Sequence, residues 1–245
     1  MPPQVDDLPT RLTAALLGAA AGEDAAGQPA GVRQLLALAE AVAGAGGAVD
    51  PAALAQAGFD TPPGGGPAGL LLRALLPALL TPLDRPRLRQ SAHRLVTLAH
   101  GDEGTAITAV ATAVLAADLC RFDLETALIR LRQTLLEEAP MALHLRLHPL
   151  GWGEMPAGSA DPGASLQMAI TALDRADGME AVVEQAARWE GEVGAACALA
   201  GALAGARDRL EGSDPAWLER IPARDRALEL GGRLGGLALG LQPAG

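Results

Sequence analysis

Residues 189–206 read W-E-G-E-V-G-A-A-C-A-L-A-G-A-L-A-G-A. The second half carries small and aliphatic side chains alone, and its two glycines, Gly201 and Gly205, are four residues apart. Glycines at this spacing share one face of a helix, and a face without Cβ atoms lets a second helix approach closely. We therefore predict a helix over 192–210 that packs against another helix in the protein core.

The remainder of the chain has the same helical character. Apolar residues between positions 32 and 42 recur at the three- and four-residue spacing of an amphipathic helix, and Gly/Pro-rich segments such as 61–67 separate the apolar stretches. The pattern indicates no strand pairs, no internal repeat and no linker, so we expect an all-α fold in a single domain over 1–245. Helices are predicted over 12–21, 32–43, 51–57, 69–80, 87–99, 103–119, from 123, over 162–172 and 178–187, from 214, and over 224–240, with an irregular segment over 141–156.

The composition limits the classes of protein. With 245 residues, 49% hydrophobic and 20% charged, the chain can bury a full core. Its formal charge of −10 would repel DNA or RNA, and its longest charge-free apolar runs, over 104–117 and 193–206, are too short to cross a bilayer. The opening M-P-P-Q-V-D-D-L-P-T is unlike a signal peptide, and Cys120 and Cys197 lack a CxxC spacing. We expect a soluble cytoplasmic protein that binds neither nucleic acid nor membrane.

Four segments carry motifs that occur together in one known family. They are 15–29 (A-L-L-G-A-A-A-G-E-D-A-A-G-Q-P), 98–114 (L-A-H-G-D-E-G-T-A-I-T-A-V-A-T-A-V), 165–187 and 191–207, and P-A-W-L follows at 215–218. In this order they resemble the ADP-ribosylglycohydrolase family, whose L-L-G run leads into G-D-A-L-G-x-P-x-E and which closes on P-x-W-L. The resemblance covers most of the chain and implies the helical fold of that family.

The resemblance also implies a chemistry. Members of the family hold two magnesium ions in a cleft and cleave the N- or O-glycosidic bond that joins ADP-ribose to a protein side chain or a small acceptor. Because Mg²⁺ requires carboxylate and hydroxyl oxygens at short distance, the family uses T-D-D-T early in the chain and G-D-T-D-T late.

This sequence departs from the family at both metal motifs. The early motif falls on 29–32, P-A-G-V, and Gly31 also stands about where the family's early glutamate is expected. The late motif falls on G-E-V-G-A, with Glu192 at its first aspartate, Gly194 at its second and Ala195 at its last threonine. Two acidic residues from different helices could hold at most a weak, water-rich site, so we predict that the two-magnesium site is lost and that the protein uses no metal or cofactor.

Our leading hypothesis is a non-catalytic homologue with a binding, regulatory or structural role. Its ligand cleft would be lined by Trp189, Gly191, Gly194 and Ala195, and the resemblance implies ADP-ribose or a related small molecule as the ligand.

Two further hypotheses stay open. The first is an active hydrolase of ADP-ribosyl linkages with a reduced or metal-free site, in which Glu192 is the surviving acid and Glu23, Asp24 and His100 are candidates to assist it. The second is a helical scaffold without a ligand, in which the apolar segment 69–80 forms the interface of a homo-oligomer.

For several other polar residues, the sequence favours a structural role over a functional one. His144 and His148 would share a helix face as zinc ligands, but the alternating leucines around them are typical of an extended segment, in which the two rings lie roughly 13 Å apart. Asp102 or Glu103 is predicted to cap the helix that follows it, and Asp177 to cap the helix over 178–187. The arginines at 85, 87, 89 and 94 are predicted to form a solvated helix face, with a small anion-binding patch as the alternative.

Overall fold

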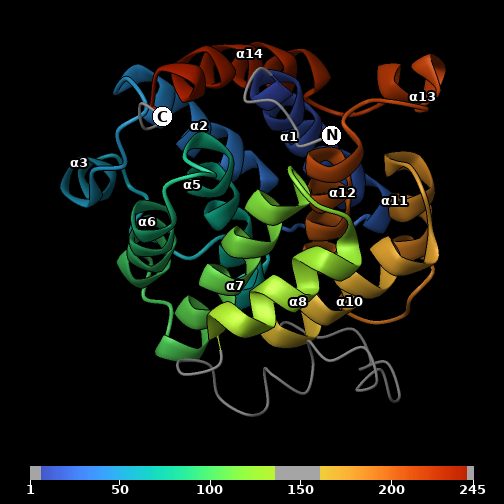
Figure 1. Cartoon of the computed structure of the whole chain (residues 1–245), viewed down its shortest axis with the longest axis horizontal. Coiled ribbons are helices and arrows are strands. Elements are labelled where there is room, and N and C mark those ends of the chain that lie inside the picture. The colour runs from blue at the N-terminus through green and yellow to red at the C-terminus, as the bar shows by residue number, and fades with distance from the viewer. Residues whose placement is uncertain (1–6, 136–160, 242–245) are drawn as a thin grey trace.

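Alanine and leucine, two of the strongest helix formers, dominate the apolar stretches of the chain, and these stretches form helices. A computed structural model describes residues 7–135 and 161–241, and every regular element in these two ranges is a helix (Figure 1). The helices are α1 (Leu8–Ala26), α2 (Val32–Gly44), α3 (Pro51–Gln56), α4 (Gly66–Gly69), η2 (Leu70–Ala74), α5 (Leu75–Leu80), α6 (Arg85–Leu98), α7 (Glu103–Leu119), α8 (Leu124–Leu135), α10 (Pro162–Arg175), α11 (Met179–Ala187), α12 (Gly194–Asp208), α13 (Pro215–Glu219) and α14 (Arg224–Leu241).

The helix that carries the quoted stretch packs against the first helix of the chain. A Cβ atom added to Gly18 of α1 would lie 2.0 Å from the carbonyl oxygen of Gly201 of α12. One added to Gly205 would lie 2.2 Å from the carbonyl oxygen of Ala14. The two backbones therefore touch without side chains between them, which confirms the predicted close helix contact and identifies α1 as the partner.

Arg11 fastens the C-terminal end of α12 to α1. The residue is 7% exposed, and its Nη1 donates hydrogen bonds to the carbonyl oxygens of Ala206 at 2.5 Å and Arg207 at 2.9 Å. These carbonyls belong to the last turn of α12, where they lack helical partners and where the helix dipole favours a cation. Sequence positions near the two ends of the chain are thus joined in the core.

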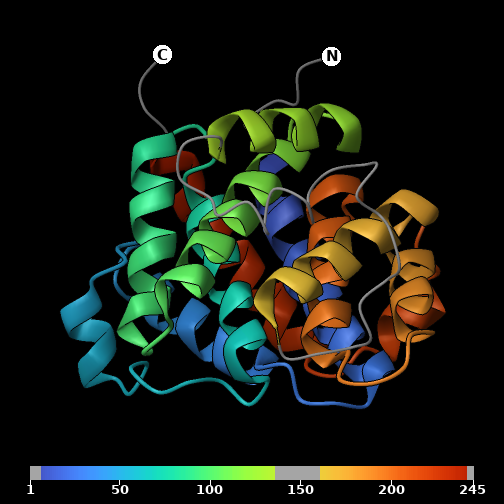
Figure 2. The same cartoon turned by 90° about the horizontal axis from the view of Figure 1, so that it is seen from below.

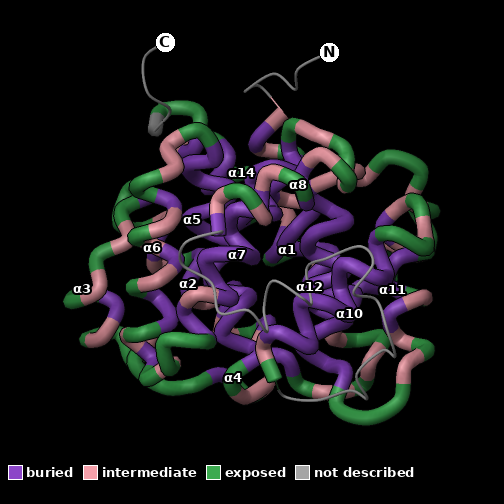
Figure 3. The backbone as a smooth tube through the Cα atoms, turned by 60° about the horizontal axis from the view of Figure 1, so that its bottom comes forward, coloured by how far each residue is buried: buried purple, intermediate pink, exposed green. Residues whose placement is uncertain are grey.

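Two layers of helices cover the α1–α12 pair. On one side α12 contacts α10 and α11, and on the outer side of α1 lies α14 (Figures 1 and 2). The second buried centre is α7, which contacts α6, α8, η2 and α5. Figure 3 shows α7 and α12 buried along nearly their whole length, whereas α3 is largely exposed.

The apolar segment 69–80 belongs to the core of the protomer, so its predicted role as an oligomer interface is wrong. Its leucines are at most 2% exposed, and Arg73 in their midst is equally buried. A helical run that is apolar on every side is typical of a fully buried segment, and its composition alone does not distinguish a core from an interface. The guanidinium of Arg73 donates to the carbonyl oxygens of Phe59 at 2.6 Å and Thr61 at 2.7 Å, and burial lowers its pKa.

The helix boundaries test the predicted caps. The Asp102 carboxylate accepts a hydrogen bond from the Thr105 backbone N–H at 2.7 Å, so the predicted cap of α7 is confirmed. The prediction for Asp177 is wrong, because the N-cap of α11 is Gly178, whose φ of 81° suits glycine. Within the predicted loop 61–67, α4 already begins at Gly66.

The remaining predictions concern charge and partners. Arg85, the first residue of the predicted basic face, forms an ion pair with Asp118, which is fully buried, so this arginine belongs to the edge of the core. None of the described helices has the length and apolar character needed to span a membrane. His144, His148 and the segment predicted to be irregular lie outside the described residues.

Candidate functional site

The two segments aligned with the family's metal motifs meet in space. A cavity of about 450 Å³ lies where the chain leaves α1 and where α12 begins, and the glycine-rich segment before η2 forms its third wall. The lining residues are Gln28, Pro29, Gly64, Gly65, Gly66, Glu192, Gly194 and Ala195. We call this the loop cavity.

Gln28 fastens the late motif to the end of α1. Its Oε1 accepts hydrogen bonds from the backbone N–H groups of Val193 at 2.9 Å and Gly194 at 3.1 Å, and its Nε2 donates to the carbonyl oxygen of Gly191 at 2.9 Å. These N–H groups lie at the N-terminus of α12, where helical partners are missing. Both the oxygen and the nitrogen of the Gln28 side-chain amide therefore form hydrogen bonds with the backbone of the 191–194 loop.

Glu23 fastens the early motif in the same way. One carboxylate oxygen, Oε2, accepts hydrogen bonds from the backbone N–H groups of Ala30 at 2.6 Å and Val32 at 3.1 Å. Because Val32 is the first residue of α2, the carboxylate caps that helix and its charge is stabilised by the helix dipole. The acid that the sequence offered as a catalytic candidate thus has a structural partner for one of its oxygens.

The packing around both loops leaves little room for a side chain at two positions that we align with the family's metal ligands, Gly194 and Gly31. A Cβ atom on Gly194 would lie 2.9 Å from the carbonyl oxygen of Gln28, and one on Gly31 would lie 2.7 Å from the Cβ of Pro63. The φ of Gly31 is 98°, which also disfavours a larger residue. An aspartate at 194 or a glutamate at 31 would require the neighbouring backbone to move.

The donors of the loop cavity can be compared with what two magnesium ions require. Mg²⁺ is held by carboxylate oxygens in near-octahedral geometry, and a pair of ions needs several such ligands. Within the described ranges, Glu192 is the sole carboxylate among the lining residues, and no group of three or more His, Cys, Asp or Glu side chains is placed to hold a metal. The described residues therefore do not fit a two-metal centre.

The structure separates the other predicted site residues. Of the predicted cleft, Gly194 and Ala195 line the loop cavity, whereas Trp189 is partly buried against the core and the carbonyl of Gly191 is bonded to Gln28. Asp24 and Glu23 line a second, larger cavity on the other side of the segment that follows α1.

His100 lies apart from both cavities. It is exposed at the end of α6 with a φ of 60°, in the left-handed conformation that often follows a helix, and it lines neither the loop cavity nor the larger one. Sequence reasoning did not find Gln28 or the 64–66 wall. Nothing in the local pattern at these positions signals a partner far along the chain.

The comparisons with known proteins agree with the fold. The ADP-ribosylglycohydrolase family model matches residues 30–243, so this helical chain belongs to the ADP-ribosylglycohydrolase family. A solved structure titled ADP-ribosylglycohydrolase-related protein complex shares the fold with a TM-score of 0.80 and 21% sequence identity, over 95% of this chain and 99% of that chain. No curated protein matches this sequence. The predicted family and the predicted all-α fold are confirmed.

Proposed function

We propose that this protein is a non-catalytic member of the ADP-ribosylglycohydrolase family that binds ADP-ribose, or a related small molecule, in the loop cavity. The observation that carries the proposal is the pair of internal hydrogen-bond sets made by Glu23 and Gln28. They occupy the N-termini of α2 and α12, the two places where the family's metal ligands would stand.

Hydrolysis of a glycosidic bond needs a group that protonates the leaving oxygen and a group that activates water or attacks the sugar. Glu192 is the acidic residue in the lining of the loop cavity that could take one of these roles. Its carboxylate is exposed and makes no hydrogen bond or ion pair with any described residue. One solvated carboxylate could act as the acid or as the base, but not as both groups together. Its position therefore suits contact with a ligand better than hydrolysis of that ligand.

A binding role is supported by the size and the walls of the cavity. Sites for small molecules usually enclose about 300–1,000 Å³, and the volume of about 450 Å³ falls within this range. Glycines at 64–66 allow a ligand to approach the backbone, because no side chains stand between.

The test combines binding and turnover on the full chain. We expect ADP-ribose to raise the melting temperature, magnesium chloride to give no heat of binding in calorimetry, and Arg-linked and Ser-linked ADP-ribose substrates to remain intact. Gly64→Trp should abolish ADP-ribose binding, because a Cβ there meets nothing closer than the Pro29 side chain at 3.6 Å and the indole can fill the cavity. Gly232→Trp, at an open position of α14, is the matched control.

Three outcomes would overturn the proposal. Turnover that Glu192→Gln abolishes would establish the active hydrolase instead. Failure of ADP-ribose to bind the unmodified chain would remove the ligand assignment, and two tight magnesium sites would contradict the loss of the metal centre.

A further inference from the structure

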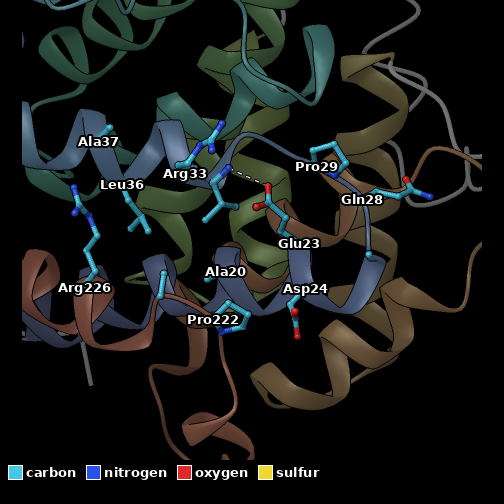
Figure 4. A pocket seen from close by; sticks show the side chains of 13 residues that line it. Ala20, Glu23, Asp24, Gln28, Pro29, Arg33, Leu36, Ala37, Pro222 and Arg226 are labelled. Atoms are coloured by element: carbon cyan, nitrogen blue, oxygen red, sulfur yellow. Dashed lines mark hydrogen bonds between the residues drawn. The ribbon is translucent and has the colours of Figure 1, made fainter.

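The larger cavity is a second site that the proposed function does not use. It encloses about 650 Å³ between the C-terminal part of α1, the first half of α2 and the start of α14 (Figure 4). Its lining residues are Ala20, Glu23, Asp24, Gly27, Gln28, Pro29, Val32, Arg33, Leu36, Ala37, Pro222, Ala223 and Arg226. We call this the charged cavity.

The middle of the charged cavity is apolar. Figure 4 shows Ala20, Leu36 and Pro222 between its two ends. An ion pair between Arg226 and Glu40 connects α14 to α2 beside the cavity, so the helices that form the walls are linked to one another. Such an arrangement, an apolar surface with a few polar groups around it, is typical of a small-molecule site.

The ends of the charged cavity carry charges of opposite sign. In Figure 4, Glu23 and Asp24 lie to one side of the apolar middle and Arg226 to the other, while Arg33 projects from α2 nearer to Glu23 than to Arg226. These four residues form no ion pair with one another. Opposite charges around one cavity that do not pair with each other can each be matched by a ligand.

The charged groups have capacity left for a ligand. Among the described residues, neither the Arg33 guanidinium nor the Asp24 carboxylate has a hydrogen-bond or ion-pair partner, and Glu23 uses one of its two oxygens for the backbone of α2. Arg226 and Glu40 are both half exposed, and an exposed pair of this kind is weak enough to be exchanged for a ligand carboxylate.

The backbone at the start of α14 is strained where it meets the cavity. Ala223 has a φ of 58°, a left-handed conformation that costs a residue with a Cβ about 1 kcal/mol. Strained residues of this kind concentrate at binding and catalytic sites, where the surrounding structure holds them. Here the strain places Pro222 and Ala223 against the apolar middle of the cavity.

From these features we infer that the charged cavity binds a short zwitterion, an aliphatic molecule with a carboxylate at one end and an ammonium group at the other. The carboxylate would meet Arg226, the ammonium group would meet Asp24 and the free oxygen of Glu23, and the methylenes would cover Ala20, Leu36 and Pro222. A ligand of one charge would satisfy one end and leave the other unmatched.

The test compares probes that differ in charge and, for the two zwitterions, in spacer length. γ-Aminobutyrate and ε-aminocaproate supply both charges with a shorter and a longer spacer, caproate supplies the anion, and hexylammonium the cation. Binding to the full chain is measured by ligand-observed NMR and calorimetry. We expect at least one of the two zwitterions to bind about tenfold more tightly than both singly charged probes.

Variants at each end of the charged cavity test which residues contact the two charges of the ligand. Asp24→Asn and Arg226→Gln should each weaken zwitterion binding about tenfold, and Ala37→Trp should abolish it by filling the cavity. Arg87→Gln is the matched control for the loss of one surface charge, and Glu192→Gln tests whether the probe has bound in the loop cavity instead. Melting temperatures show that each variant is folded.

Three results would overturn the inference. They are equal affinity for all four probes, zwitterion binding that Asp24→Asn and Arg226→Gln leave unchanged, and no binding of either zwitterion. None of them bears on ADP-ribose in the loop cavity, so failure here is distinguishable from failure of the proposed function.

Discussion

The α1–α12 pair is held together in two different ways along its length. In the middle, at Gly18 and Gly201, the two backbones touch without side chains between them. At the end, where α1 stops and α12 starts, the Gln28 side chain bridges the gap with three hydrogen bonds. The middle is held by direct backbone contact, and the end is held by polar contacts in the two segments that we align with the family's metal motifs. The contacts in the middle need no metal ion.

The largest effect is expected for Gly201→Ala, which tests the backbone contact in the middle. The added Cβ would lie 2.0 Å from the carbonyl oxygen of Gly18, so the helices must separate. We expect a loss of about 3 kcal/mol in the free energy of unfolding, measured by urea denaturation with circular dichroism. Gly232→Ala, at an open position in α14, is the control and should gain up to about 1 kcal/mol from helix propensity.

The rate at which a thiol reagent labels Cys197 provides an independent measure of the same contact. It lies beneath Gly22 in the interface, and burial raises the pKa of its thiol to about 12, so a thiol reagent reacts after opening of the interface. A loss of about 3 kcal/mol in Gly201→Ala should speed labelling about a hundredfold. Labelling at the unmodified rate would mean that the interface absorbs the extra methyl group without opening.

A smaller loss is expected for Arg11→Met, which tests the fastening at the far end of α12. The variant leaves the buried carbonyl oxygen of Ala206 and the partly buried carbonyl oxygen of Arg207 without their donor. We expect a loss of about 2 kcal/mol in the free energy of unfolding, because unsatisfied buried polar groups are costly. Arg233→Met removes an exposed arginine whose nearest acid, Glu229, is 3.6 Å away, and it should change stability by less than about 0.5 kcal/mol.

Gln28→Ala tests the polar bridge between the end of α1 and the start of α12. It removes the three hydrogen bonds to the 191–194 loop, and we expect a loss of about 1–2 kcal/mol together with faster amide hydrogen exchange in the first turn of α12. Asp24→Ala, an exposed position four residues earlier, should leave both quantities unchanged. Equal behaviour of the two variants would show that packing alone holds this end.

The smallest effect is expected for Glu23→Gln. Glutamine keeps an oxygen that can accept from Ala30 and Val32, but it removes the negative charge at the N-terminus of α2. A charge in this position contributes about 0.3–1 kcal/mol and is screened by salt. Urea denaturation at low and at high sodium chloride should show the difference at low salt and little of it at high salt. A difference that salt does not reduce would assign the effect to hydrogen-bond geometry.

The sequence predicts correctly those parts of the fold that depend on local residue patterns. The four-residue spacing of Gly201 and Gly205 predicts a close helix contact, and the helix over 103–119 with its Asp102 cap follows from the residues at its start. The alignment of two motifs also predicts which segments form the loop cavity, because motifs that share a function in the family share a location.

The rest depends on contacts that local patterns do not encode. Gln28 has its partners more than 160 residues away, and an isolated glutamine gives no sign of them. The segment 69–80 has the composition of a core and of an interface alike, and burial decides between them. Asp177 is a residue type that often caps helices, but the N-cap of α11 is the next residue, Gly178, whose positive φ favours glycine.

The bond from Arg11 to the carbonyl of Ala206 spans 195 residues of sequence, and it has a consequence for biosynthesis. The first helix leaves the ribosome long before its partner has been translated, so its buried leucines, among them Leu12 and Leu16, stay uncovered while most of the chain is being made. Such distant contacts slow folding, because a long loop must close before they form. We expect nascent chains that end before α12 to stay bound to chaperones and to be released once that helix emerges.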